Sequence, residues 1–402
     1  MNITKTTDFI HSIPVYWALS GLFFIPKGDK ILVTFIIISL ITKIVGHLLL
    51  KDRITFNFSK LNGIIFVASI YASFSYFLHT YSSSEIRVLI STLLYLLISF
   101  PNIKSLRSNV LIVILFGSSL ALAGMMYEIL YLEGLDRRSF PLSAIPFANF
   151  IAILALLNYY IFDNLVSSRR FSFISFGTTI ILLTSVLLTE TRGTWLAITV
   201  AALFIAFIKK DRFISPKKII ITIIIFTFSI FASSHYIKKQ YNETKIQLDT
   251  YYVDKSYSSL SIRLHLWRAG LNIIADSPSL IGLGQSEHIA IIQRNTPPSN
   301  PLSWFDNKNF HNSYIDRTVK YGFIGLGIFL TFLGYPFYRG LKEKDPRLKI
   351  PLITLPIFIS VAALTYVPLS HPGTFFLYIF IMHYYIQASD MAREKRLEAT
   401  NA

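Results

Sequence analysis

Three basic side chains in this sequence belong to residue types that can act on a phosphorylated substrate, namely Arg192, Arg263 and His311. A guanidinium group binds phosphate oxygens through two parallel hydrogen bonds, and an uncharged imidazole can take a proton from a hydroxyl group. Each residue lies beside an apolar run: Arg192 in TETRGTW, Arg263 in SSLSIRLHLWRAG and His311 in FHNSYIDRTVKYGFIG. This placement indicates a candidate site at the surface of a membrane.

The arginines also have purely structural interpretations. Arg192, at the outer end of an expected helix, could reach lipid headgroups, and Arg263 could lie on a solvated helix face. The tight turn expected around Arg192, and the rule that positive charge stays inside, argue against the headgroup interpretation. Arg137 and Arg138 lie on another expected outer loop, where an anionic lipid headgroup explains them as well as a substrate does.

The histidine stands in a more distinctive setting. His311 and Asn312 begin an expected helix, and Gly322 and Gly325 follow three residues apart. Glycines at this spacing let a neighbouring helix approach closely, which is typical of a site and not of a linker. A histidine at a helix start is nevertheless often a cap or a surface residue. Three other histidines compete with it, and position alone does not choose among them: His265, His288 and His371.

The composition sets the class of protein that must position these residues. The chain has 402 residues, of which 53% are hydrophobic and 15% aromatic, so it is expected to be a polytopic membrane protein in contact with membrane lipids. Its net charge of +16 comes from short clusters between apolar runs, which reports topology, so no nucleic-acid partner is expected. The absence of cysteine excludes disulfides, thiolate catalysis and cysteine-ligated metals.

Apolar runs that can cross about 30 Å of hydrocarbon predict an all-α fold with about twelve transmembrane helices. The first run, after MNITKTTDF, is interpreted as a retained span and not as a cleaved signal peptide. The chain divides into helices 1 to 9 (1–235), a large outer loop (236–320), and helices 10 to 12 with a tail (321–402). The expected spans are 12–26, 31–50, 61–79, 86–100, 109–131, 142–162, 171–189, 194–208, 218–236, 321–339, 350–368 and 373–388.

The loop charges predict an orientation. With the N-terminus inside, most of the loop Lys and Arg residues face the cytoplasm, and an even number of spans returns the basic C-terminus to the same side. The long segment 236–320 then lies outside. It carries one helical stripe with serines upstream as caps and Asp276, Ser277 and Pro278 as a stop, which predicts an amphipathic surface helix. The stripe consists of Leu260, Leu264, Trp267, Leu271 and Ile274.

Several motifs together resemble one known family. They are R-x-x-x-W from Arg263 to Trp267, the GLG that ends at Gly284, and H-N followed after nine residues by G-x-x-G, from His311 to Gly325. With TETRGTW upstream in the same order and spacing, they resemble the O-antigen ligase family, strongly from about 185 to 335 and by hydropathy elsewhere. The resemblance implies a GT-C-like glycosyltransferase of the bacterial inner membrane with a periplasmic site. Such enzymes transfer O-polysaccharide from undecaprenyl pyrophosphate to lipid A-core during lipopolysaccharide assembly, and other O-antigen assembly proteins are expected partners.

The residues fit that chemistry. A pyrophosphate that leaves an anomeric carbon gains negative charge, and the scattered outer carboxylates contain no D-x-D pair, so neither a metal nor another cofactor is expected. We expect Arg192 and Arg263 to bind the pyrophosphate and His311 to act as the general base in an inverting displacement. The secondary candidates are Asn312, Arg137, Arg138, Trp267, Gly322 and Gly325.

Three alternatives remain open from the sequence. An O-antigen polymerase and a protein O-oligosaccharyltransferase belong to the same superfamily and share the donor and the fold. H-N-x9-G-x-x-G and the chain length favour the ligase, and the absence of a large soluble C-terminal domain argues against protein glycosylation. A transporter of polyprenyl-linked glycans would place ionisable residues or broken helices near the membrane midplane, and this pattern is not seen.

Overall fold

The structure is a computed structural model that describes residues 3–50, 56–79, 83–131, 144–164, 169–209, 238, 241–247, 259–294 and 309–401. All regular structure in these ranges is helical, and no strand occurs in them, which confirms the all-α class. The first eight elements are α1 (Ile3–Leu19), α2 (Gly28–Leu50), α3 (Lys60–His79), α4 (Ser83–Leu94), the π-helix η1 (Tyr95–Ser99), α5 (Ile103–Tyr131), α6 (Ala144–Asn164) and α7 (Arg169–Leu188). The remainder are α8 (Arg192–Ile208), α10 (Ser259–Asp276), α11 (Gly284–Arg294), α12 (Ser313–Lys342), α13 (Pro346–Ala362), the short η4 (Pro368–Ser370) and α14 (Pro372–Asn401).

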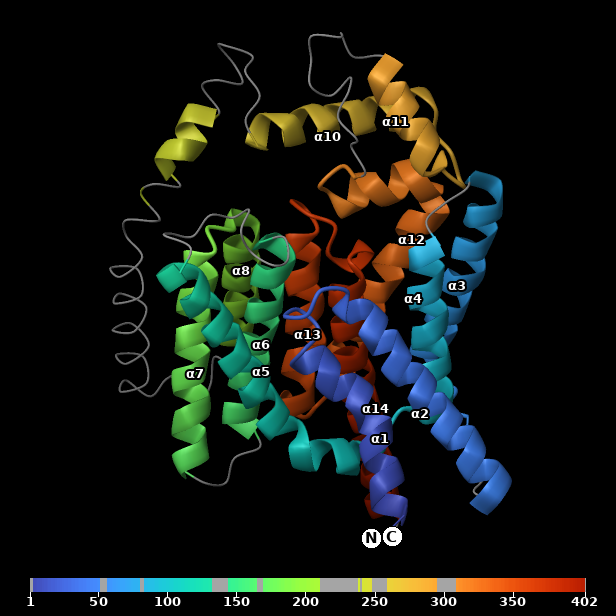
Figure 1. Cartoon of the computed structure of the whole chain (residues 1–402), viewed down its shortest axis with the longest axis vertical. Helices are drawn as coiled ribbons and strands as arrows, with labels where there is room; N and C mark the ends of the chain where they lie inside the picture. The colour runs from blue at the N-terminus through green and yellow to red at the C-terminus, as the bar shows by residue number, and fades with distance from the viewer. Residues whose placement is uncertain are drawn as a thin grey trace.

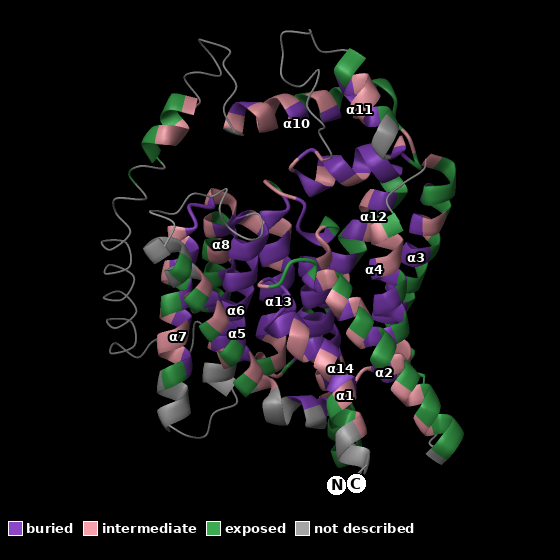
Figure 2. Ribbon diagram, viewed as in Figure 1, coloured by how far each residue is buried: buried purple, intermediate pink, exposed green. Residues whose placement is uncertain are grey.

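The long helices form an upright bundle, and α10 and α11 lie across one end of it (Figure 1). Both termini lie at the opposite end of the bundle (Figure 1). The centre of the bundle is built from α6, α13 and α14, where Phe150, Phe358, Phe376 and Tyr378 are fully buried (Figure 2). The amphipathic helix expected in the long segment is therefore present as α10, and it lies at the end of the bundle away from the termini.

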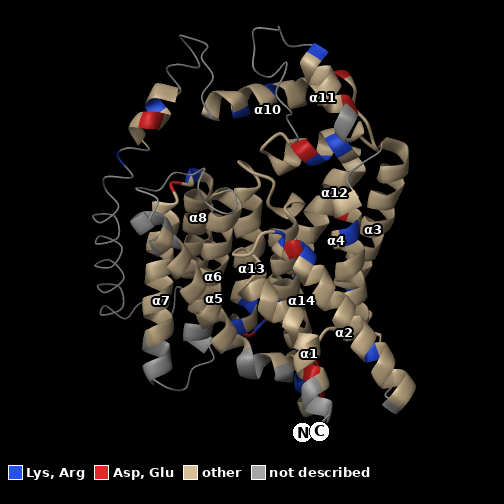
Figure 3. Cartoon of the chain, in the orientation of Figure 1, with Lys and Arg blue, Asp and Glu red and all other residues tan. Residues whose placement is uncertain are grey.

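The outer surface of the bundle is apolar, as expected for a membrane protein. On α2 and α3 the exposed side chains include Ile41, Leu48 and Phe77, and Phe77 is 83% exposed. Charged residues gather towards the two ends of the bundle, and the lengths of the helices between them are mostly uncharged (Figure 3). Among the described helices, α2, α3 and α12 are long and apolar enough to cross a membrane, and α6, α7 and α8 contain shorter apolar stretches.

The expected spans coincide with helices wherever the structure describes them, although their boundaries differ. The ninth expected span, 218–236, lies outside the described residues, and the total of twelve crossings stays a prediction. The first expected span, 12–26, is wrong at both ends, since α1 begins at Ile3 and ends at Leu19. The chain turns after α1, and Lys27 adopts a left-handed backbone (φ 60°) immediately before α2, so the apolar run to Pro26 does not continue the helix.

A break in α12 divides it into a surface section and a section that descends into the bundle. At Gly322 the backbone has φ 66° and ψ −169°, outside the helical region, and a side chain there would collide with the backbone of Leu280 and Ile281. The amides of Phe323 and Ile324, freed by the break, donate to the carbonyls of Ser279 and Leu280 (3.1 Å each). The close approach expected at this glycine is therefore made by the turn before α11, and not by a helix.

The buried face of α10 differs from the predicted stripe. Leu266, Gly270 and Ile273 are buried, whereas Leu271 is 56% exposed. The reason is the glycine: a Cβ at Gly270 would meet the side chains of Phe310 and Ile315, so this face is the one on which α10 rests against the start of α12. The helix and its end at Asp276 are as expected, and only the prediction of which face is buried was wrong.

Candidate functional site

The motif TETRGTW forms a tight turn between α7 and α8. Glu190 has a left-handed backbone (φ 53°), and the hydroxyls of Thr189 and Thr191 lie 2.5 Å apart. The indole of Trp195 donates to the carbonyl of Val186 (2.9 Å), which ties the first turn of α8 back to α7. Arg192 is therefore the first residue of α8 and is held in a fixed corner.

The two predicted arginines line one cavity of about 150 Å³. It lies between the N-terminal ends of α6 and α8, the first half of α10 and the end of α13. The described residues around it are Ile145, Asn149, Thr191, Arg192, Gly193, Thr194, Gln247, Leu260, Arg263, Ala362, Thr365 and Tyr366. Gly193 is needed here because any side chain would collide with Thr365. The structure thus brings together residues that are far apart in the sequence.

The cavity is built to attract an anion. The first turn of α8 lines it, and the free amides and dipole at a helix N-terminus favour negative charge. The guanidinium groups of Arg192 and Arg263 add two positive charges. The carboxylate of Glu243 lies 3.6 Å from the guanidinium of Arg192, so it neutralises part of that charge when no ligand is bound.

His311 lies beside this cavity in a strained backbone conformation. Its φ is 50°, a value that is uncommon for a non-glycine residue and that is concentrated at functional sites. Its ring lies near that of Tyr366, with 6.4 Å between the ring centroids, and Tyr366 lines the cavity. The Nδ1 atom of His311 is buried and has no hydrogen-bond partner among the described residues, so it is available to a ligand.

The surroundings of His311 keep its imidazole uncharged. Burial, followed by the positive charge of Arg263, lowers the pKa of His311 to about 4, and Asp316 opposes this shift. A group with such a pKa is neutral at physiological pH and can accept a proton. The dependence on Arg263 also places the predicted base within electrostatic reach of a predicted pyrophosphate-binding residue.

Asn312 fixes the start of α12 and is its N-cap. Its side-chain oxygen accepts hydrogen bonds from the amides of Tyr314 and Ile315 (3.0 and 3.2 Å), the usual arrangement for this residue type. Its amide nitrogen donates to the carbonyl of Leu364 (3.1 Å), and the amide of Ser313 donates to Ala363 (2.8 Å). These bonds hold the start of α12 against the end of α13, where Tyr366 lies.

A buried ion pair supports the same turn. The ammonium of Lys320 lies 2.7 Å from the carboxylate of Asp316, and the two side chains are 4% and 2% exposed. The same oxygen of Asp316 accepts a hydrogen bond from the amide of Phe310 (3.2 Å). The pair therefore fixes the backbone immediately before His311.

Two of the competing histidines, His288 and His371, are not among the described residues that line this cavity. His288 is fully buried, bonds to the carbonyl of Gly284 (3.0 Å) and packs on Phe310, so it has a structural position. His371 stacks on Phe23, with 6.0 Å between the rings. Trp267 packs against the apolar cluster between α10 and α12 and is not among the described residues around the cavity. Arg137 and Arg138 lie outside the described residues.

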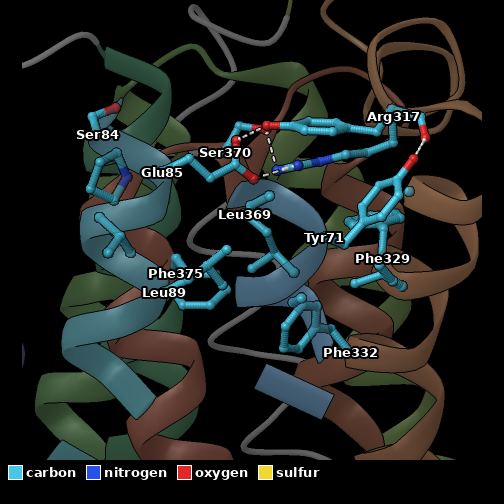
Figure 4. Close-up of a pocket in the computed structure, with 17 residues that line it drawn as sticks. Tyr71, Ser84, Glu85, Leu89, Arg317, Phe329, Phe332, Leu369, Ser370 and Phe375 are labelled. Carbon is cyan, nitrogen blue, oxygen red and sulfur yellow. Dashed lines mark hydrogen bonds and ion pairs between the residues drawn. The ribbon is translucent and has the colours of Figure 1, made fainter. Parts of the chain in front are cut away.

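A second, smaller cavity of about 50 Å³ lies between α3, α4, α12 and the start of α14 (Figure 4). Its polar end is closed by Arg317, which pairs with Glu85 (2.5 Å) and donates to the hydroxyl of Ser370 (2.9 Å) (Figure 4). The hydroxyl of Tyr321 donates to the other oxygen of Glu85 (2.5 Å). These groups satisfy one another, so we interpret them as a clamp that fastens the surface section of α12 to α4.

Gly325 does not line the arginine cavity. Gly325 lines the second cavity, and a side chain there would collide with Tyr321 of the preceding turn, so it accommodates the break in α12. Within the part of the chain that the structure describes, no three His, Asp or Glu side chains group together as metal ligands would.

Sequence reasoning did not identify several residues of the cavity, among them Asn149, Thr365 and Tyr366. Tyr366 and Thr365 follow α13 with no motif around them, and Asn149 lies in the apolar run AIPFANFIAILALL. For Asn149 a signal existed, because an amide side chain inside a membrane helix needs a polar partner. Glu243 carried no signal beyond its charge.

Two comparisons with known proteins find similarity to O-antigen ligases. Residues 177–330 match the family model described as O-antigen ligase, a range that contains Arg192, Arg263 and His311. The chain is also similar to an O-antigen ligase of Escherichia coli (strain K12), with 27% identity over 290 residues, which cover 69% of this chain and 67% of that protein. The matched range ends within the descending section of α12. On this evidence the chain is similar to O-antigen ligases, through the family model over residues 177–330 and through the Escherichia coli protein over 69% of the chain.

Proposed function

We propose that this protein is an O-antigen ligase that transfers O-polysaccharide from undecaprenyl pyrophosphate to a sugar hydroxyl of lipid A-core. The observation that carries the proposal is the cavity lined by Arg192 and Arg263 next to the uncharged imidazole of His311. The similarity to O-antigen ligases supports a glycosyl-transferring enzyme in general.

The donor's pyrophosphate binds between the two guanidinium groups. Each guanidinium can form a two-point contact with phosphate oxygens, and the N-terminus of α8 faces the same space. Because these groups are fixed by the α7–α8 turn and by α10, they can neutralise the charge that develops on the leaving group without rearranging. Glu243 gives up its contact with Arg192 when the donor binds.

The acceptor hydroxyl loses its proton to His311 as it attacks. A bond forms between the acceptor oxygen and the anomeric carbon, and the bond from that carbon to the pyrophosphate oxygen breaks. The electron pair of the broken bond stays on undecaprenyl pyrophosphate, and the proton stays on the imidazole until water removes it. This single displacement inverts the anomeric centre and uses no covalent intermediate. Base catalysis of this kind contributes roughly 10² to 10⁴-fold.

Transfer in vitro tests the proposal. Purified protein, undecaprenyl-pyrophosphate-linked O-polysaccharide and rough lipopolysaccharide should give ligated product in the presence of EDTA. His311→Ala should lower the rate by about 10² or more, and Arg263→Ala should also lower it strongly while leaving a measurable residual rate. Arg268→Ala is the matched control, because Arg268 is exposed on the same helix and lies away from the cavity. Wild-type activity in His311→Ala would remove the base assignment.

The acceptor that is used distinguishes an O-antigen ligase from an O-antigen polymerase. If the product forms only when lipid A-core is present, the ligase is supported. If carrier-linked repeat units are joined to each other instead, the protein is a polymerase. We further propose that the protein lies in the bacterial inner membrane with this cavity on the periplasmic face and both termini in the cytoplasm.

A further inference from the structure

One buried polar side chain in the arginine cavity has no part in the mechanism above. Asn149 lies in the second turn of α6, near its outer end, and it is 0% exposed. It lines the same cavity as Arg192 and Arg263. An amide at this depth has to be paired with something, because a buried polar group without a partner costs free energy.

The oxygen of the Asn149 amide has a hydrogen-bond partner within the protein. The hydroxyl of Thr194, in the first turn of α8, donates to Oδ1 of Asn149 at 2.8 Å, and Thr194 also lines the cavity. This bond fixes the rotation of the amide group, so its nitrogen cannot turn to another acceptor without losing it. Nδ2 of Asn149 is buried and has no acceptor among the residues that the structure describes.

The neighbours of Nδ2 define what kind of group it can bind. The cavity is lined by two guanidinium groups and by a helix N-terminus, all of which donate hydrogen bonds and carry positive charge. A ligand that suits them all must offer several acceptors and negative charge. A phosphate group meets this requirement, and a hydrogen bond to a charged oxygen is stronger than one to a neutral hydroxyl.

We propose that Asn149 is a pyrophosphate-binding residue whose Nδ2 donates a hydrogen bond to a phosphate oxygen of the carrier lipid, held between Arg192 and Arg263. Thr194 acts as the positioning residue that orients the amide. This inference rests on the proposed donor, undecaprenyl pyrophosphate, and adds a neutral contact from α6 to the charged contacts from α8 and α10.

Binding of undecaprenyl pyrophosphate to the purified full-length protein tests the proposal. Asn149→Ala should weaken binding by about tenfold or more, as expected for the loss of a hydrogen bond to a charged group. Asn149→Asp should weaken it further, because the carboxylate keeps the bond from Thr194 but repels the phosphate. In transfer assays the KM for the donor should rise in Asn149→Ala, and the KM for the acceptor should stay unchanged.

Asn158 provides the matched control. It lies on the same helix and is equally buried, but its amide nitrogen donates to the hydroxyl of Ser118 (2.8 Å) and to the carbonyl of Leu154 (3.0 Å). Asn158→Ala should lower the melting temperature and leave the Kd for undecaprenyl pyrophosphate within about twofold of wild type, since no ligand contact is lost. Melting temperatures without ligand identify any variant that fails to fold, and Asn149→Ser then replaces it.

The outcomes separate the two proposals. If wild-type protein does not bind undecaprenyl pyrophosphate, the proposed function fails. If wild-type protein binds it and the folded Asn149 variants bind it equally well, the role of Asn149 is wrong and the proposed function stands. An equal loss in Asn158→Ala would also overturn the role of Asn149, because it would show a general effect of disturbing α6.

Discussion

His311 combines two properties that are costly in a folded protein. Its backbone is left-handed, and the Nδ1 atom of its ring is buried without a hydrogen-bond partner among the described residues. The strain is maintained by the residues on either side, since Asn312 caps α12 and the amide of Phe310 is held by Asp316. A structural histidine such as His288 shows neither feature, because its Nδ1 is paired with the carbonyl of Gly284. The Nδ1 of His371 is also buried without a partner among the described residues, but its backbone is not left-handed, so the combination of both features favours His311 as the reacting group.

The pH dependence of transfer should report the pKa of His311. Burial and Arg263 lower that pKa to about 4, so the imidazole is neutral above this value and becomes protonated below it. We therefore expect kcat/KM to stay flat from about pH 8 to about pH 6 and to fall only as the pH approaches the pKa. Arg263→Gln should shift the fall of its residual activity to higher pH, because it removes a cation that depresses the pKa. A wild-type profile that falls near pH 6.5 would contradict this assignment.

The sequence predicted the basic residues that the structure brings to one cavity or beside it, but it did not predict their neutral neighbours or the ion pair of Arg192 with Glu243. Arg192 could be singled out because positive charge at the outer edge of an apolar run is unusual. Arg263 and His311 were chosen through the motifs R-x-x-x-W and H-N-x9-G-x-x-G. Tyr366 and Asn149 could not be assigned to the site, since their importance depends on which helices are neighbours. The assignment of Arg137 and Arg138 to the site stays a prediction.

At the scale of single elements, periodicity predicted that α10 is a helix and gave its end at Asp276. It did not predict the buried face, because apolar residues occur around much of the helix and packing decides among them. Gly270 allows Phe310 and Ile315 to approach, and this contact outweighs the burial of Leu271. A glycine on a surface helix was the signal that could have indicated the correct face.

The break at Gly322 leads to a prediction about α12. Gly322→Ala should destabilise the protein and lower transfer, because alanine is strained at φ 66° and would collide with the turn at Leu280 and Ile281. A cost of about 1–3 kcal/mol is expected from strain of this kind. The measurements are the melting temperature in detergent and the rate of transfer.

Gly327→Ala is the matched control for that experiment. Gly327 lies in the descending section of the same helix, and a Cβ there would meet nothing within 4 Å. Alanine should be tolerated at this position or stabilise the helix by about 0.5–1 kcal/mol. If both substitutions had the same effect, the break at Gly322 would not be important for the site.

At the scale of the whole molecule, hydropathy predicted the order of the helices, and the charge of the loops predicted their direction. Neither could predict how the helices meet. Residues of α8, α10 and α13 surround one cavity, while the clamp of Glu85 and Arg317 joins α4 to α12. Such contacts depend on shape and on a few polar pairs, which a single sequence does not reveal.

The direction of the bundle in the membrane can be tested because the chain contains no cysteine. Single cysteines can therefore be introduced at Ser277, after α10, and at Glu398, near the end of α14, both of which are exposed. A membrane-impermeant maleimide should label Ser277→Cys in intact spheroplasts, and it should label Glu398→Cys only after the membrane is permeabilised. The expectation follows from the excess of Lys and Arg in the loops on the side of the termini.

The same experiment decides whether the proposed reaction is possible for this fold. The α10 end of the bundle carries the arginine cavity and His311, and the termini lie at the other end (Figure 1). A polysaccharide that is joined to lipid A-core in the periplasm can reach only a site that opens on that side. If Glu398→Cys were labelled in intact spheroplasts and Ser277→Cys were protected, the cavity would face the cytoplasm. The Lys- and Arg-rich loops on the side of the termini would then face the periplasm. The ligase function would be excluded even if the cavity bound pyrophosphate.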